Sequence, residues 1–289
     1  MPDNGIELFA TCWTSAGDVA PLMASEVSPV PVDDRIAAVA STGWAGMGFV
    51  QDDLKLLREQ IGFDALRTKI ADAGLKYTEV EILGDWWETG PRREASDAMR
   101  ELLFDAAVAL DAAHIKIGTA FGDSLDSIDP LVAPLRDLAD AAADRGVRVA
   151  IEAMPFSMVS TIPMAADLVH AVDRPNCGVL VDSWHVFRAG TPLADLRESL
   201  SREIIFGVEL DDAAAEVSGT MFEDTRDRRL PCGEGAFDLV GLIQTLHGLG
   251  WTGPWGVELI SNEHRAKDVV TALRDAHDSA LAVISEALS

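Results

Sequence analysis

The feature of the sequence that most limits its fold is a regular alternation of short apolar runs with longer amphipathic segments. The short runs have the length of buried strands, and the longer ones show the apolar spacing typical of helices. The predicted strands are residues 7–13, 46–50, 77–83, 114–119, 148–154, 178–182, 204–210 and 255–259. The predicted helices are residues 34–41, 53–73, 95–112, 131–145, 164–172, 192–200, 237–248 and 267–287.

Eight strands, each followed by a helix, predict a closed parallel (β/α)8 TIM barrel. No Ser/Gly-rich linker or low-complexity segment interrupts the series, so we expect a single domain over residues 1–289. An open doubly wound sheet is the alternative. It is disfavoured because the glycine-rich segment at 43–48 lacks the context of a phosphate-binding loop.

The connections between these segments differ in length at the two ends of the predicted barrel. The turns from helix to strand around residues 74, 146 and 250 are short, whereas three strand-to-helix connections, 14–33, 84–93 and 213–236, are long. Long loops are uncommon unless they bind a ligand or cover a site. In a barrel these loops follow the carboxyl ends of the strands, so that end is predicted to hold the active site.

The charge of the chain excludes several classes of function. The formal net charge is -25, which disfavours nucleic acid and anionic membrane surfaces as partners because both attract clustered Lys and Arg. Three widely spaced cysteines give no disulfide framework, and no signal-peptide-like or membrane-spanning apolar segment is present. We therefore expect a cytoplasmic protein.

Four of the predicted strands carry a carboxylate at or near their carboxyl ends. These acids are Glu152, Asp182, Glu209 and Glu258, on the last four strands. Desolvated carboxylates repel one another unless a cation or a proton compensates them. Each acid could instead pair with Arg or Lys, but the repetition over consecutive strands favours a shared metal site. Oxygen ligands of this charge suit Mn2+ or Mg2+ before Zn2+ or Co2+, so a divalent metal ion, most simply Mn2+, is the predicted cofactor.

The same segments resemble a known group of proteins. The motifs IEAMP, LVDSWH, VELDD, RRLPCGEGAFD and GPWGVELIS, between residues 149 and 261, resemble the sugar phosphate isomerase/epimerase superfamily of xylose-isomerase-like barrels. That group includes tagatose/psicose 3-epimerases, inosose isomerases and dehydratases, and 3-dehydroshikimate dehydratases. The resemblance implies metal ligation by Glu152, Asp182, Glu209 and Glu258. Glu209 stands where relatives usually have histidine, and Asp211 is an alternative ligand or a supporting residue.

The resemblance also implies roles for other residues. Glu152 and Glu258 would form the acid/base pair, while His185 and Arg229 would bind substrate oxygens. The reaction implied is proton abstraction next to a metal-bound carbonyl, through an enediolate, on a sugar, keto-sugar or inosose. Relatives are often homodimers or homotetramers.

Three further residues are predicted to bind substrate on weaker signals. Lys116 is a cation in a short apolar strand and could offset the acids, or extend to solvent at a strand end. Glu81 shares a strand face with Glu79 and lies nearer the carboxyl end. Trp13 lies where an aromatic face could contact a sugar ring, or where it could simply pack a loop.

Two alternative functions stay open. A metal-dependent dehydratase or lyase on a cyclic keto-polyol or keto-glycoside is favoured by the aromatic-rich loops. It is also favoured by Met158, which stands where the sugar epimerases carry another acid. An apurinic endonuclease-like hydrolase on the same barrel is less consistent with the sequence, because that function needs metal-binding histidines and a basic groove. The expected substrate is therefore a small polyhydroxylated carbonyl compound.

Overall fold

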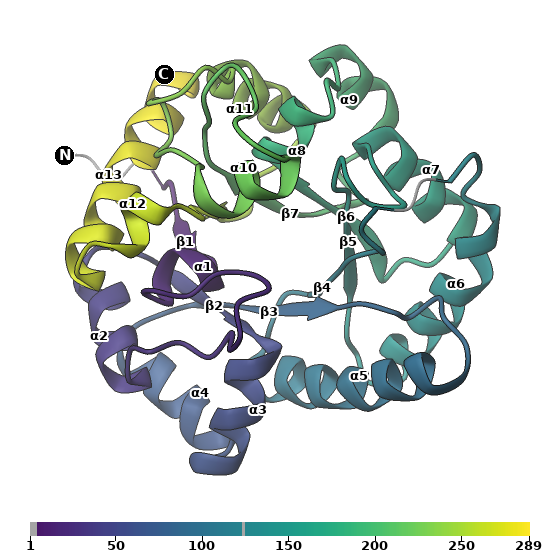
Figure 1. Cartoon of the computed structure of the whole chain (residues 1–289), viewed down its shortest axis with the longest axis horizontal. Helices are drawn as coiled ribbons and strands as arrows, with labels where there is room; N and C mark the ends of the chain where they lie inside the picture. The colour runs from purple at the N-terminus through teal and green to yellow at the C-terminus, as the bar shows by residue number, and fades with distance from the viewer. Residues whose placement is uncertain (1–4, 123–124) are drawn as a thin grey trace.

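The computed structural model describes residues 5–122 and 125–289. Within them, eight parallel strands follow one another in sequence order and close into a barrel, because β1 pairs with both β2 and β8. The helices surround this barrel as an outer layer (Figure 1). The predicted (β/α)8 fold is confirmed.

The strands are shorter than the apolar runs that predicted them. They are β1 (Leu8–Ala10), β2 (Gly46–Val50), β3 (Tyr77–Leu83), β4 (Ile115–Ile117), β5 (Val149–Glu152), β6 (Cys177–Asp182), β7 (Ile205–Leu210) and β8 (Trp255–Val257). Nearly all their side chains are buried, as expected of a parallel sheet covered by helices on its outer face.

The helices fall into two groups. The outer layer consists of α2 (Val32–Ser41), α3 (Gln51–Gln60), α4 (Phe63–Asp72), α5 (Gly90–Leu110), α6 (Asp129–Ala143), α7 (Ile162–Val172), α9 (Leu193–Ser199), α11 (Leu239–Gly248) and α13 (Val269–Ala287). Four short helices follow strands: α1 (Cys12–Ser15), α8 (Ser183–Arg188), α10 (Met221–Asp227) and α12 (Asn262–Arg265).

Two predictions of local structure were wrong. The helix expected over 53–73 is two helices, α3 and α4, because Gly62 between them takes a φ of +78°, which interrupts helical geometry. The first strand ends at Ala10, and the chain then turns into α1, so Trp13 lies on a helix instead of a strand.

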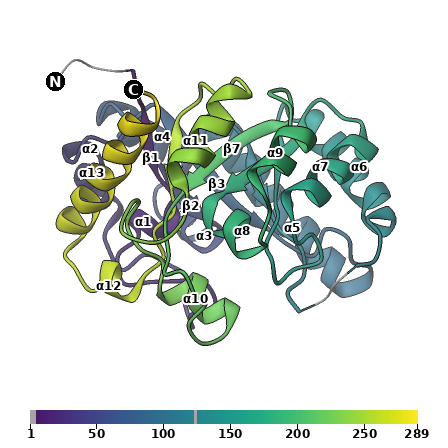
Figure 2. The ribbon, with the colours of Figure 1, turned by 90° about the horizontal axis from the view of Figure 1, so that it is seen from above.

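Long connections and short helices gather at one end of the barrel. Figure 2 shows α10 and α12 at one edge of the molecule, opposite the edge that carries the C-terminus. That edge is the carboxyl end of the strands, as the sequence predicted. Within the described residues, no helix is both long enough and apolar enough to cross a membrane.

The first strand-to-helix loop is held by a buried arginine. Arg35 of α2 is 1 % exposed, and its guanidinium donates to Asp53 Oδ2 at 2.6 Å and to the carbonyl of Gly48 at 2.9 Å. It also donates to Ser15 Oγ at 3.0 Å and to the carbonyl of Cys12. The helix that carries Trp13 is thereby fixed to β2 and α3.

Replacing Arg35 tests this arrangement. In Arg35→Met the carboxylate of Asp53 stays buried without its partner, and such a loss typically costs about 3 to 5 kcal/mol. The free energy of unfolding, measured by urea denaturation, should therefore fall by about 3 to 5 kcal/mol. Arg67→Met, at an exposed position on α4, is the control and should change it by less than about 0.5 kcal/mol. Equal effects of the two variants would contradict the assignment.

Candidate active site

The four acids predicted from the sequence lie together at the carboxyl ends of β5 to β8. Each offers a carboxylate oxygen, and these oxygens all lie within 4.8 Å of one another. None of the four residues is more than 4 % exposed. Asp182 of β6 and Glu209 of β7 are direct neighbours in the sheet, and Glu258 directly follows β8, where its N–H still donates to the carbonyl of Leu210. Parallel pairing therefore brings these acids to one place.

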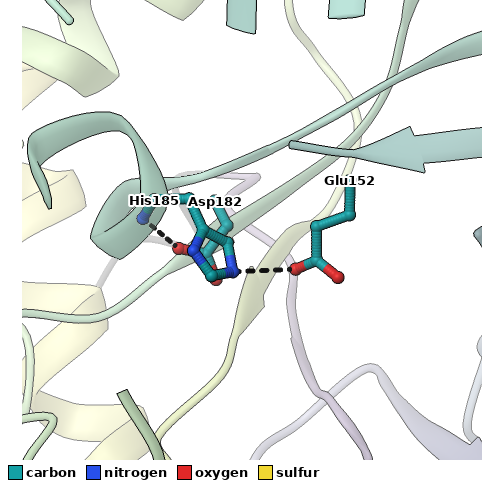
Figure 3. Close-up of side chains that lie close together, drawn as sticks. All are labelled: Glu152, Asp182 and His185. Atoms are coloured by element: carbon teal, nitrogen blue, oxygen red, sulfur yellow. Dashed lines mark hydrogen bonds and ion pairs between the residues drawn. The ribbon is translucent and has the colours of Figure 1, made fainter. Parts of the chain in front are cut away.

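Asp182 and the short helix α8 position His185. Asp182 is the N-cap residue of α8, and its Oδ1 accepts the backbone N–H of His185 at 3.0 Å. The imidazole is thereby directed toward β5, with Nε2 at 3.4 Å from Glu152 Oε1. Figure 3 shows the three side chains converging. The spacing of three residues in DSWH thus reflects a helix cap.

Arg229 connects two of the four acids, and also contacts Asp211. Its Nη1 donates to Asp182 Oδ2 at 2.8 Å, lies 3.1 Å from Glu258 Oε2, and contacts the carboxylate of Asp211. The guanidinium is 1 % exposed and is further held by the hydroxyl of Thr225 at 2.8 Å. Most of its donors are therefore used within the protein.

Asp211 supports Arg229 and lies outside the group of four acids. Its carboxylate accepts the hydroxyl of Ser183 at 2.9 Å on one side and contacts Arg229 on the other. Burial raises the pKa of Asp211 well above its usual range, against the opposing effect of Arg229. The structure thus favours the supporting role over ligation for this residue.

Lys116 lies at the centre of a second set of contacts. Its Nζ is 2.7 Å from Glu209 Oε1, 2.9 Å from Glu258 Oε1 and 3.0 Å from Glu81 Oε2. The residue has no exposed surface. Burial alone would lower the pKa of the ammonium, but the surrounding carboxylates raise it well above its usual value. Three carboxylates within 3.0 Å thus favour the charged form of Lys116, and of the two alternatives drawn from the sequence it offsets the acids.

The acids nevertheless outnumber the cations that contact them. Burial raises the pKa of Glu81 to about 8 and that of Glu209 well above its usual range. By contrast, Lys116 and His185 overcome the effect of burial on Glu152 and leave its pKa below the usual value. Such an excess of buried acid is compensated either by bound protons or by a further cation. The all-oxygen donor set fits a divalent metal ion.

A cavity of about 170 Å3 opens above these acids. Among the residues that line it are Trp13, Glu81, Glu152, His185, Arg229 and Glu258. The sequence had pointed to each of these six. Glu209 and Lys116 are fully buried, and their charged groups face each other.

The sequence analysis missed the apolar part of the cavity wall. Leu22, Phe121, Phe156 and Phe222 also line the cavity. The signal was available in part, since Phe156 directly follows the motif that carries Glu152 and Phe222 lies in the long seventh loop. The sequence does not show which loop residues turn inward.

Fold and site together define a (β/α)8 barrel with an acidic, metal-compatible centre at the carboxyl ends of its last four strands. Residues 36–276 match the family model described as "Xylose isomerase-like TIM barrel", and the chain belongs to this family.

Two groups of curated proteins are similar to the chain. It is 30 % identical over 245 residues to a 3-dehydroshikimate dehydratase of Pseudomonas aeruginosa, a match that covers 81 % of this chain and 37 % of that protein. It is 32 % identical over 154 residues to an inosose isomerase of Bacillus licheniformis, covering 53 % of this chain and 54 % of that protein. The chain therefore spans about half, or less, of the length of these relatives.

Solved structures share the fold. The IOLI protein, described with a bound zinc atom, superposes with a TM-score of 0.83 at 19 % identity over 98 % of this chain and 100 % of that one. A D-allulose 3-epimerase from Methylomonas sp. superposes with a TM-score of 0.69 at 16 % identity over 96 % and 98 % of the two chains.

Removing the charge of Lys116 tests the compensation of the acids. In Lys116→Met, measured in EDTA, Glu209 and its neighbours lose their ammonium partner, and the free energy of unfolding should fall by about 3 kcal/mol or more. Adding Glu209→Gln to that variant should restore part of the loss, with a coupling energy of about 1 to 3 kcal/mol in the double-mutant cycle. The exposed Lys55→Met is the control. Strictly additive effects would refute the pairing.

Proposed function

We propose that the protein is a divalent-metal-dependent isomerase or epimerase that acts on an uncharged sugar, keto-sugar or inosose. The observation that carries this proposal is the convergence of the four acids Glu152, Asp182, Glu209 and Glu258. Two of them, Glu152 and Glu258, line one small cavity together with His185 and Arg229. The similarity to inosose isomerases, and the fold shared with an allulose epimerase, support it.

Glu152, Asp182 and Glu258, together with Glu209, would hold the metal ion. When bound, such an ion polarises a substrate carbonyl and makes the proton on the neighbouring carbon more acidic. Mn2+ is our preferred ion because the four residues offer oxygen donors only. Lys116 is completely buried and does not line the cavity. It would therefore neutralise Glu209 and Glu258 from inside the barrel instead of touching the substrate.

Glu152 and Glu258 are the proposed acid/base pair. They come from β5 and from the end of β8, strands that are not adjacent in the barrel, so they approach the cavity from different sides. The lowered pKa of Glu152 favours its carboxylate form, which can accept a proton. One residue would remove the proton next to the carbonyl and the other would return a proton, either to the opposite face or to the neighbouring carbon.

His185 would orient the substrate, while Arg229 would hold the acids beside it. The Nε2 atom of His185 lies 3.4 Å from Glu152 Oε1 in the cavity wall, where it can also reach a substrate hydroxyl group. Arg229 lines the cavity but already binds three carboxylates. It would therefore fix the acids and offer little charge to a substrate anion.

A dehydratase on a cyclic keto-polyol is the second candidate, favoured by the similarity to a 3-dehydroshikimate dehydratase over most of this chain. The proton next to the carbonyl would again be removed by one glutamate. The C–O bond at the next carbon would then break, and the departing hydroxide would take a proton from the other glutamate and leave as water.

The electrostatics of the cavity favour an uncharged substrate in either reaction. Its lining carries the acids Glu26, Glu81, Glu152 and Glu258. The two arginines that line it, Arg226 and Arg229, are both paired with carboxylates. A carboxylate or phosphate group on the substrate would enter without a free cation among the described lining residues.

The first test concerns the metal ion. Protein stripped with EDTA should bind one equivalent of Mn2+ and melt at a higher temperature when loaded. Glu152→Gln and Glu258→Gln should each lose this binding and reduce turnover by about a hundredfold or more. Glu263→Gln, at an exposed position beyond β8, should behave as the native protein. A lack of Mn2+ binding by the native protein would overturn the proposal.

The second test concerns the charge of the substrate. The Mn2+-loaded protein should convert uncharged inososes or ketoses, and should convert 3-dehydroshikimate, which carries a carboxylate, at least about tenfold less efficiently in kcat/KM. Product analysis by NMR separates epimers and isomers from dehydrated products. Preferential conversion of 3-dehydroshikimate would establish the dehydratase instead.

Cytoplasmic location, oligomeric state and the exclusion of nucleic acid stay predictions of the sequence.

A further inference from the structure

Three phenylalanine rings pack together at the mouth of the cavity. They come from three different loops: Phe121 follows β4, Phe156 follows β5, and Phe222 belongs to α10 after β7. The ring centroids of Phe121 and Phe156 are 5.0 Å apart, and that of Phe222 lies 6.1 Å from each. We call these three residues the aromatic mouth.

One ring of the aromatic mouth, and a leucine beside it, are more exposed than packing alone requires. Phe121 is 48 % exposed, and Leu22, which lines the same cavity from the first loop, is 64 % exposed. A cluster of apolar side chains at the surface of a cavity commonly marks a binding site. The exposed hydrophobic residues of a protein are otherwise scattered singly over its surface.

The backbone fixes these rings in place. The segment of Phe121 is bridged to that of Ser157, with Gly122 N donating to the carbonyl of Phe156 at 2.8 Å and Met158 N to that of Ala120 at 3.1 Å. Phe222 lies in the first turn of α10, which begins with a capping box formed by Thr220 and Glu223. The three rings are thus held by ordered structure.

The aromatic mouth is continuous with the polar floor, by which we mean the cavity-lining residues Glu81, Glu152, His185, Arg229 and Glu258. Phe156 contacts the imidazole of His185 with a centroid distance of 6.1 Å, and His185 faces Glu152. A single substrate could therefore touch both parts at once. A free sugar or inosose carries a hydroxyl on nearly every carbon, so its small apolar face needs one ring at most. Three rings and Leu22 offer more apolar surface than such a substrate can cover.

We propose that the substrate carries an apolar, ring-bearing substituent that lies in the aromatic mouth, as in an aryl keto-glycoside. The keto-sugar part rests on the polar floor, and the substituent lies against Phe121, Phe156 and Phe222. This inference rests on the proposed function, since it extends the substrate of the same site.

The test compares two probes that differ only in the substituent. Phenyl and methyl 3-keto-β-D-glucopyranoside are titrated into the Mn2+-loaded protein by calorimetry. The phenyl compound should bind about tenfold or more tightly, because its ring leaves water on binding. In Phe121→Ser and Phe222→Ser this ratio should fall toward one, while the Kd of the methyl compound stays within about twofold. The exposed Val108→Ser, on α5, is the matched control and should keep the native ratio.

The outcomes separate this inference from the proposed function. Two results would refute the proposed apolar substituent without affecting the proposed metal site. They are equal binding of both probes, and binding of neither probe to protein that does bind Mn2+. Failure to bind Mn2+ overturns the proposed function, and the inference with it. A native ratio in Phe121→Ser, with a change of oligomeric state in light scattering, would show that the rings contact another copy of the chain.

Discussion

The structure of the active end depends on the compensation of buried carboxylates. Acids at the ends of β5 to β8 lie within a few ångströms of one another, and two cations, Lys116 and Arg229, connect them. Each cation contacts three carboxylates, so each acts on several strands at once. Because an unpaired buried charge is costly, these contacts allow the acids to be buried inside the barrel. The carboxylates that these two cations do not compensate form a site suited to a divalent metal ion.

The glutamate at position 209, where the family resemblance leads one to expect histidine, is accommodated by the same interaction. A neutral ligand needs no counterion, whereas a fourth buried carboxylate does. Lys116 lies in β4, inside the barrel, and reaches both oxygens of Glu209. The two residues are therefore best regarded as one unit. This unit keeps the oxygen donor set while it limits the negative charge of the site.

The two parts of the cavity divide the recognition of substrate between them. The floor is charged, and the two arginines that line the cavity are already paired with carboxylates, which disfavours anions. The mouth is aromatic and is held by backbone bridges and a helix cap. Together they fit the substrate we propose, which has an uncharged polyhydroxylated head and an apolar substituent. Affinity for the substituent would come from desolvation, whereas the chemistry stays with the acids on the strand ends.

The sequence by itself determined the barrel, the end at which its long loops gather and the acids that meet there. Strand and helix periodicity is local, and acids in apolar strands stand out because burial without compensation is costly. The break at Gly62 and the turn into α1 were missed, because apolar spacing continues through both. Only the tertiary structure decided that Lys116 pairs with Glu209, that Asp211 supports Arg229 and that three phenylalanines meet at the mouth. Those contacts join residues far apart in the chain, and their geometry depends on barrel closure and on loop paths that no local pattern encodes.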